Sequence, residues 1–374
     1  MNRHINFYFL GVSVFLLVFG LLFLSTLSAI ASLKAFNNTH YYIFHQLIGA
    51  SIGLIFGFIA FKVPLVFLKK VSPLILFLNL LFLVAVIFPF IGTRYLGASR
   101  WINIFGVTLQ PSEFFKLTII LYVSAWISGN FSDQTKKNWA LSAKKEYDNF
   151  VWVFLPFSFF LLVIIGVFYF QKDISTLGII IVTLLSIYFA SKTPLWHLLL
   201  FIAGGIGGFF MLIRFEPYRM ARFLTFLNPD NDPLGKGLQL KQSIIAIGSG
   251  GFFGKGLGLS TQKFGFLPES MSDSIFAIIG EETGILGCAV LILLLLWFLY
   301  LGFKIADNSN DKFSQLVAVG VTTWIVFQAF INIASSLGLF PLAGIPLPFF
   351  SYGSSHLIAE MIGVGLLLNI SKNT

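Results

Sequence analysis

Residues 6–31 read NFYFLGVSVFLLVFGLLFLSTLSAIA, a run without a single charged side chain. A bilayer core needs roughly 20 consecutive apolar residues for one helical span, and this run exceeds that length. Further apolar runs follow along the rest of the chain. They are continuously apolar, whereas the strands of a membrane β-barrel alternate apolar and polar residues. The sequence therefore predicts a helical membrane protein.

The composition supports this prediction. Hydrophobic residues make up 57% of the 374-residue chain and charged residues 10%, whereas a soluble domain is about one quarter charged. The net charge of +9 does not indicate a nucleic-acid partner, because the Lys and Arg residues lie in short gaps between apolar runs. There they set orientation and contact anionic membrane lipid. The single cysteine, Cys288, excludes an intrachain disulfide.

We expect an all-α polytopic membrane protein with about ten transmembrane helices. The whole chain, 1–374, forms a single transmembrane domain. Its first helix is too long in its apolar stretch for a cleaved signal peptide. A long extracytoplasmic loop, residues 215–272, joins the seventh and eighth helices. The predicted spans are 6–31, 44–62, 71–90, 113–130, 151–170, 176–191, 195–214, 274–303, 313–337 and 354–370.

The distribution of basic residues predicts the orientation. Ten spans place both termini on one side, and the positive-inside rule makes that side the cytoplasm of a multi-pass inner-membrane protein. The long loop then falls outside, since long loops translocate largely regardless of charge. The inside segments carry Arg3, Lys62, Lys69, Lys70, Lys136, Lys137, Lys144, Lys145, Lys192, Lys304, Lys312 and Lys372, and the short outside loops carry Lys34, Arg94, Arg100 and Lys172.

The long outer loop has an unusual composition. An Asn-Pro-Asp turn at 228–230 is followed by a glycine-dense passage from Gly248 to Gly258. Glycine lets the backbone turn tightly and approach a ligand closely. A flexible linker is the alternative, but apolar side chains such as Ile244 and Phe252 favour an ordered loop that packs on the membrane or over a cavity.

Charged residues inside predicted spans indicate cavities or paired charges, because each costs at least about 2.5–3.5 kcal/mol on insertion scales. Glu113 and Lys116 open the fourth span three residues apart, on one helical face. A structural pair and a catalytic role both remain open for them. Glu281 and Glu282 lie deeper, and we expect one of them to be a structural charge partner, for example of Arg100 or Lys116.

Asp273 differs from these residues in its position. It lies where the basic outer loop enters the eighth span, at the outer membrane interface. A general base acting on a lipid-linked substrate would need this location. Spacing alone does not establish that role.

Several short motifs follow one another along nearly the whole chain, each weak alone and specific together. They are ASRWI (98–102), QPSEFFK (110–116), NPDNDP (228–233), QSIIAIGSGG (242–251), GKGLG (254–258), LPESMSDSIFA (267–277) and GIPLPFFSYG (344–353). In this order they resemble the SEDS family (shape, elongation, division and sporulation), which includes FtsW, RodA and SpoVE. Where common members read His-Thr-Asp-Phe, this chain has Met-Ser-Asp-Ser at 271–274, so a neighbouring histidine is not required by the expected chemistry.

The resemblance implies a peptidoglycan glycosyltransferase that polymerises lipid II into β-1,4 glycan strands at the outer face of the cytoplasmic membrane. Lipid II is a disaccharide-pentapeptide on undecaprenyl pyrophosphate. In the family, the aspartate matching Asp273 is the proposed catalytic residue, and the residues matching Arg100, Glu113 and Lys116 are functionally important. Members work with a class B penicillin-binding protein, the transpeptidase that cross-links the new glycan.

From these inferences we expect Asp273 to be the catalytic base and a set of polar residues to bind the substrate. A divalent cation, Mg²⁺ or Mn²⁺, could help to neutralise the pyrophosphate, as the family's metal dependence implies, but the sequence contains no cluster of His or Cys ligands. No organic cofactor is expected. The predicted substrate-binding residues are Arg100, Glu113, Lys116, Arg219, Arg222, Gln242, Ser243 and Lys255.

Two other functions fit parts of the sequence. A lipid II flippase would also place Glu281 and Glu282 within the membrane, because ion pathways use such residues. A flippase needs access from both faces, however, and the charges here concentrate on the outer one. A non-catalytic scaffold would tolerate the loss of Asp273. Within the family, the local sequence of residues 262–269 and 278–282 slightly favours an FtsW-like role in cell division over a RodA-like role in elongation.

Overall fold

The computed structural model describes residues 6–86, 88, 92–95, 98–104, 107–134, 149–215 and 217–373. A helix coincides with each of the ten predicted spans, and seven of the described helices are long and apolar enough to cross a membrane. The polytopic helical fold is therefore confirmed, while ten crossings remain a prediction. The helices are α1 (Phe7–Phe36), α2 (Tyr41–Lys62), α3 (Leu65–Ala85), α4 (Pro111–Gln134), α6 (Leu155–Gln171), α7 (Ile174–Ala190), α8 (Trp196–Phe215), α9 (Pro217–Leu227), α10 (Lys236–Gly250), α11 (Ile275–Asp307), α12 (Lys312–Ser336) and α13 (Ser354–Lys372).

Short polar side chains begin several of these helices. Asn6, Asp173 and Asp311 each accept a hydrogen bond from a backbone N–H in the first turn of α1, α7 and α12. Such caps satisfy donors that would otherwise remain unpaired. Within the helices, the backbone bonds are internal, as a hydrocarbon environment requires.

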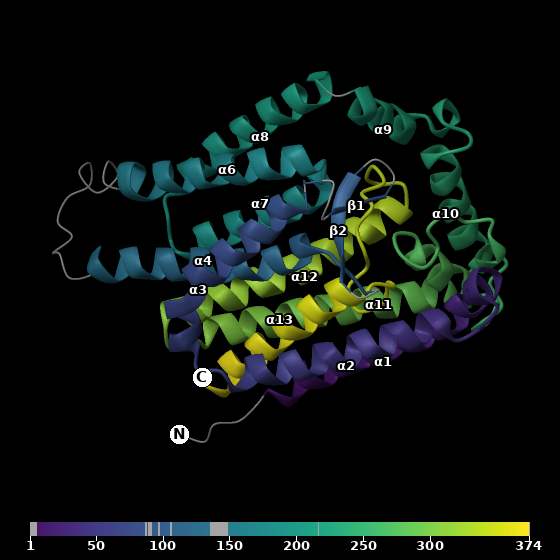
Figure 1. The fold of residues 1–374 in the computed structure, drawn as a ribbon, viewed down its shortest axis with the longest axis horizontal. Helices are drawn as coiled ribbons and strands as arrows, with labels where there is room; N and C mark the ends of the chain where they lie inside the picture. Colours follow the sequence, from purple (N-terminus) through teal and green to yellow (C-terminus); the bar gives the residue numbers. More distant parts are fainter. Residues whose placement is uncertain are drawn as a thin grey trace.

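Helix α12 lies at the centre of the bundle (Figure 1). In its most apolar 18-residue window 78% of the residues are buried, against 17% in α3. Helix α13 packs against α2 through small residues: a Cβ atom at Gly365 would lie 2.1 Å from the carbonyl oxygen of Gly57. Small residues allow this close approach of helices in membranes. The exposed apolar side chains lie on peripheral helices such as α3, where lipid can cover them.

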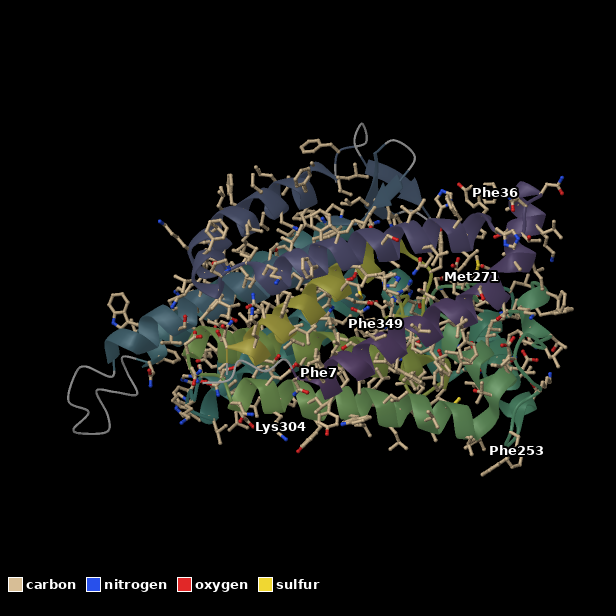
Figure 2. All side chains as sticks on the ribbon, turned by 90° about the horizontal axis from the view of Figure 1, so that it is seen from below. Phe7, Phe36, Phe253, Met271, Lys304 and Phe349 are labelled. Atoms are coloured by element: carbon tan, nitrogen blue, oxygen red, sulfur yellow. The ribbon has the colours of Figure 1, made fainter. Side chains whose placement is uncertain are left out.

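The two ends of the bundle differ in character. At one end the start of α1 meets the end of α13, where Asn6 N donates to Ser371 Oγ at 3.4 Å. The turn before α12 reaches the same end through Asn310, which donates to Asn373 O at 2.8 Å. In Figure 2 Lys304 lies toward this end, and Phe36, Met271 and Phe253 lie toward the other. Of the residues predicted to be cytoplasmic, Arg3, Lys136, Lys137, Lys144 and Lys145 lie outside the described residues.

A small sheet at the opposite end was missed by the all-α prediction. Strands β1 (Gly92–Tyr95), β2 (Ala98–Ile104) and β3 (Val107–Leu109) form an antiparallel sheet between α3 and α4. Ile102 pairs with Leu109 in its register. The β-branched and aromatic residues from Trp101 to Val107 favour strands, and this signal was hidden between two much stronger apolar runs.

The segment 215–272, predicted to be an extracytoplasmic loop and called the outer segment below for that reason, is also more regular than a loop. It contains α9 and α10, and its glycine-dense passage is ordered, as predicted. Residues 251–256 run beside the first part of α11: Lys255 N donates to Glu281 O at 3.0 Å, and Ile285 N donates to Gly251 O at 3.0 Å. At Gly284 α11 is interrupted by a non-helical backbone, with φ of 66° and ψ of −165°. We call the paired segments 250–256 and 280–286 the glycine seam.

Glycine is needed in this seam because two backbones touch. A Cβ atom at Gly254, where φ is +81°, would lie 2.2 Å from the carbonyl oxygen of Glu282. We therefore predict that Gly254→Ala destabilises the folded protein by about 2 kcal/mol or more, measured as a fall in Tm in detergent. Gly248→Ala is the matched control, since nothing lies within 4 Å of its Cβ position. Equal Tm values for the two variants would contradict the seam's tight packing.

Candidate active site

Asp273 lies at the entrance to α11, on the face of the bundle opposite the chain ends. Its side chain is half-buried, and its Oδ2 is 3.4 Å from the position that a Cβ atom at Gly344 would take. Its backbone carbonyl accepts a hydrogen bond from Asn332 Nδ2 at 2.9 Å. The next residue, Ser274, accepts one from Gln239 Nε2 at 2.9 Å. The backbone at Asp273 is thus held between α10 and α12, and its carboxyl lies beside the segment before α13.

Three cationic residues from separate elements act electrostatically on this carboxyl. Burial raises the pKa of Asp273 from its ordinary 3.8 to about 6, and the charge of Lys236, in α10, is the largest influence opposing that rise. Glu269 raises the pKa of Asp273 further, whereas Arg222 in α9 and Arg100 in β2 lower it. A carboxyl that releases its proton near pH 6 is ionised at neutral pH and still basic enough to accept one.

Lys236 was missed by the sequence analysis, and so were Gln239 and Glu269. Lys236 Nζ donates to Gln239 Oε1 at 3.0 Å, which links it through Gln239 to Ser274. Its backbone N–H donates to Asp232 Oδ2 at 2.8 Å, at the start of α10. The amphipathic pattern of residues 236–250 could have revealed this helix and placed Lys236 at its first turn.

Arg100 is placed by the sheet. Its Nη2 donates to the backbone carbonyl of Lys172, and its Nη1 lies 3.7 Å from Asp173 Oδ1, the cap of α7. The side chain is 23% exposed. Arg100 therefore combines an anchored guanidinium with access to an anion.

Glu113 and Lys116 form an ion pair at 2.7 Å inside the bundle, with side chains 4% and 2% exposed. Lys116 Nζ also donates to Gln328 Oε1 at 2.7 Å and lies over the ring of Trp324, 5.0 Å from its centre. This environment fits the structural alternative: Lys116 is already neutralised and covered. A direct role in substrate binding stays a prediction.

Glu281 and Glu282 do form charge pairs, but the suggested partners Arg100 and Lys116 are wrong. Glu281 accepts from Lys255 Nζ at 2.6 Å and from Thr261 Oγ1 at 2.7 Å, and also from the Ser260 hydroxyl. Glu282 lies 3.7 Å from Lys263 Nζ. The partners come from the outer segment because the glycine seam folds that segment back onto the start of α11.

The remaining predicted binding residues have diverse surroundings. Ser243 is buried and donates to Gln239 O at 2.8 Å within its own helix. Gln242, on the next position of α10, is half-buried. Lys255 is engaged with Glu281 and is 34% exposed. The side chain of Arg219 lies outside the described part of the chain. Binding roles for these four residues stay predictions.

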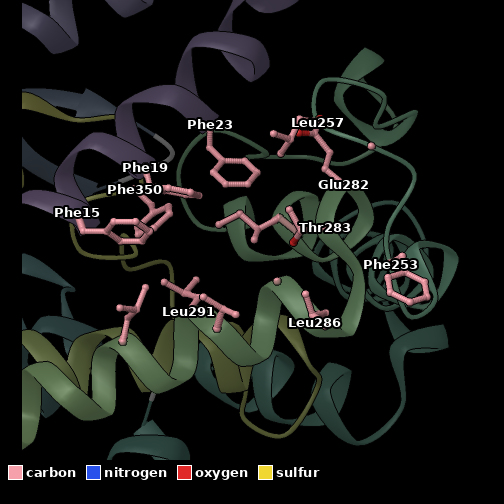
Figure 3. A pocket seen from close by; sticks show the side chains of 15 residues that line it. Phe15, Phe19, Phe23, Phe253, Leu257, Glu282, Thr283, Leu286, Leu291 and Phe350 are labelled. Carbon is pink, nitrogen blue, oxygen red and sulfur yellow. The ribbon is translucent and has the colours of Figure 1, made fainter. Parts of the chain in front are cut away.

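An apolar groove of about 350 Å³ opens between α1 and α11. Phe15, Phe19 and Phe23 line one wall together with Phe350, and Leu286 and Leu291 line another (Figure 3). Asp273 does not line this groove. The segment from Gly344 to Tyr352, which we call the support loop, connects the two places, since Gly344 adjoins Asp273 and Phe350 adjoins the groove.

The donor set around Asp273 does not support a preformed metal site. Among the described residues no group of three or more His, Cys, Asp or Glu side chains is placed to hold a metal ion. Glu269 is the carboxylate that influences Asp273, and it accepts from Ser272 Oγ at 2.9 Å. The divalent cation stays a prediction, and no step below uses one.

Residues 7–374 match the family of cell cycle proteins that comprises FtsW, RodA and SpoVE. The chain belongs to this SEDS family. It is 35% identical to stage V sporulation protein E of Bacillus subtilis, with 96% of this chain and 95% of the relative aligned. It is 34% identical to a probable peptidoglycan glycosyltransferase FtsW of Trichlorobacter lovleyi, over 94% of this chain and 89% of the relative.

Solved structures of SEDS proteins share the fold. A chain of a peptidoglycan synthase complex that coordinates polymerization and crosslinking superposes with a TM-score of 0.76 at 22% identity, covering 98% of this chain and 97% of the other. Rod shape determining protein RodA of Thermus thermophilus gives a TM-score of 0.69 at 21% identity, covering 98% and 96%. At these identities the likeness concerns the fold.

The interactions of Glu281 with Lys255, Ser260 and Thr261 lead to a prediction about stability. Glu281→Gln removes the charge that Lys255 and the neighbouring hydroxyls surround, and breaking such a buried pair costs about 3 kcal/mol or more. Asp230→Asn is the matched control, because Asp230 pairs with Lys241 on the surface, with side chains 75% and 44% exposed, for at most about 1 kcal/mol. Thermal unfolding should show a clearly larger loss of Tm for Glu281→Gln; equal losses would refute the anchoring role.

Proposed function

We propose that this chain is a peptidoglycan glycosyltransferase that polymerises lipid II, and that Asp273 is its general base. One observation carries the chemical part of the proposal. A half-buried carboxyl, its pKa raised to about 6 by burial, is under the electrostatic influence of Lys236, Arg222 and Arg100 at the end of the bundle away from the chain termini. The reaction needs a base that accepts the proton of the acceptor hydroxyl and cations that stabilise the anionic leaving group. Asp273 and the three cationic residues are groups of these two kinds.

The proposed step is a single displacement at the anomeric carbon of the glycan donor. The acceptor's 4-hydroxyl transfers its proton to the Asp273 carboxylate while its oxygen bonds to that carbon. The bond from the carbon to the pyrophosphate oxygen breaks, and the lipid pyrophosphate leaves with the electron pair. One displacement inverts an α-linked donor into a β-1,4 product, as one base directs an inverting glycosidase.

The leaving pyrophosphate gathers negative charge, which the cations beside Asp273 would stabilise. Arg100 and Arg222 can offer planar, bidentate donors, and Lys236 a compact charge. Charges fixed before the reaction cost no reorganisation when the transition state forms. Lys116 and Lys255 contribute less to this step, since each is held in a short ion pair, at 2.7 and 2.6 Å, whereas Arg100 Nη1 lies 3.7 Å from Asp173 Oδ1.

The orientation of the protein follows from the charges at the two ends. Lys62, Lys304, Lys312 and Lys372 lie near the helix ends that gather with the chain termini, and basic residues favour the cytoplasmic side. Asp273 then faces the outside of the cytoplasmic membrane, where lipid II presents its sugars. The undecaprenyl chain of the substrate stays in the bilayer throughout.

A class B penicillin-binding protein is the proposed partner. A fold relative was solved as part of a peptidoglycan synthase complex, and cross-linking must follow polymerisation in the same place. An FtsW-like division role remains the preferred one. The flippase alternative loses support, because Glu281 and Glu282 are paired with Lys255 and Lys263 of the outer segment.

The central prediction concerns Asp273→Asn. This variant keeps the shape of the side chain and removes the base, so lipid II polymerisation by the purified protein with its partner should fall by at least about 10³-fold. Ionisation of the raised-pKa carboxyl opposes folding above about pH 4, so the variant should keep or increase the Tm at pH 7. Asp230→Asn, on the surface, should polymerise at the native rate. Substantial polymerisation by Asp273→Asn would rule out the proposed base.

The pH dependence gives a second test. Since the pKa of Asp273 is raised to about 6, the rate should rise about tenfold per pH unit below 6 and level off above it. Lys236 lowers that pKa, so Lys236→Gln should move the acid limb to higher pH. Lys241→Gln, on the same helix, controls for the lost charge. If the acid limb of Lys236→Gln stays at the native pH, Lys236 does not influence the pKa of the catalytic base.

A further inference from the structure

Asn332, in the middle of the outer half of α12, contacts the main chain of Asp273 directly. Its Nδ2 donates to Asp273 O at 2.9 Å and to Ile345 O at 2.8 Å. The side chain belongs to a residue that is 1% exposed. Both acceptors are carbonyls, so only the NH₂ group can face them, and the orientation of the amide is fixed.

The other end of this amide is left without a partner. Asn332 Oδ1 is buried and has no hydrogen-bond donor among the described residues. An unpaired buried acceptor costs about 1–3 kcal/mol. A side chain selected only for stability would avoid that cost, and local rules of this kind are typically broken at functional sites. Because both N–H groups of the amide point to the two carbonyls, its oxygen points to a place where no described residue donates to it.

The support loop that Asn332 joins to Asp273 is itself held from three sides. Gln328 Nε2 donates to Pro346 O at 3.1 Å, and Glu360 Oε2 accepts from Phe349 N at 2.9 Å. Phe349 has a φ of +67° and a buried ring, a strained conformation that persists only when its surroundings fix it. Farther along, Tyr352 N donates to Met271 O at 2.8 Å.

We propose that Asn332 is a positioning residue for glycosyl transfer. By tying the carbonyl of Asp273 to that of Ile345, it fixes the direction from which the carboxylate meets the acceptor hydroxyl. The inference rests on the proposed function, because it assumes that Asp273 is the base. Misplacing a reacting group by about 1 Å can cost about 10²-fold in rate, so one hydrogen-bonded link has a measurable effect.

The test uses Asn332→Leu, a variant of similar volume that donates no hydrogen bond. We expect kcat for lipid II polymerisation to fall about 10- to 100-fold while KM stays within about twofold. The acid limb should also move to lower pH, because a loosened Asp273 carboxyl becomes better hydrated and its pKa returns toward 3.8. Ser336→Ala is the matched control: Ser335 and Ser336 both donate to Asn332 O, and either can do so alone.

A second variant approaches Asp273 from the opposite side. Gly344→Ala places a side chain beside Asp273 Oδ2 at a φ of +67°, a backbone conformation that residues other than glycine rarely adopt, and so strains the support loop without removing a buried polar group. It should give the same loss of kcat. If Asn332→Leu is not recovered folded, this variant decides the question with the same readouts.

The possible outcomes separate the two claims. If Asn332→Leu has the native kcat per folded molecule and the native acid limb, the positioning role is overturned. It is also overturned if the activity of this variant falls only in proportion to the amount of folded protein. If Asp273→Asn is inactive in the same assay, such an outcome for Asn332→Leu overturns only the positioning role of Asn332 and leaves the proposed base in place. If Asp273→Asn remains active, the proposed base is wrong, and the positioning inference is lost with it.

Discussion

The outer half of the molecule depends on one carboxylate, Glu281. Its oxygens accept from Lys255, from the hydroxyls of Ser260 and Thr261, and from backbone N–H groups that follow. A charge buried in this way is stable only when its donors surround it. Satisfying it brings residues 255–262 back onto α11, and the glycine seam is the backbone geometry that permits the return. This anchor acts together with the backbone hydrogen bonds of the seam, such as those from Lys255 N to Glu281 O and from Ile285 N to Gly251 O.

The candidate site is assembled from elements far apart in the sequence. Arg100 comes from a strand, Arg222 and Lys236 come from two helices of the outer segment, and Asn332 comes from the central helix α12. Each element has an independent structural reason to stand where it does: the sheet register, the α10 cap at Asp232 and the burial of α12. The charged groups therefore meet Asp273 with little freedom, which is the condition for electrostatic preorganisation.

The apolar runs sufficed to predict the helical membrane fold and most helix positions, because a bilayer imposes length and hydropathy on every span. The motifs sufficed to predict the family, whereas the catalytic role of Asp273 stays a prediction. The partners of Glu281 could not be read from the sequence, since they depend on a chain reversal built from backbone contacts of Gly250 and Gly254. Lys236 and Asn332 were missed for a related reason: Lys236 acts electrostatically on Asp273, 37 positions away, and Asn332 donates to Asp273, 59 positions away, so neither belongs to a local pattern.

The interruption of α11 at Gly284 also fixes where the hydrocarbon begins. At 1.5 Å per residue, the part after the break, from Ile285 to Asp307, is about 34 Å long, close to the ~30 Å thickness of a bilayer's apolar core. The whole helix of 33 residues would overshoot that thickness by a wide margin. The part after the break is therefore long enough to cross a bilayer by itself, without the turns that carry Glu281 and Glu282. Two carboxylates that read as intramembrane charges in the sequence are instead buried against lysines of the segment that folds back onto the start of α11.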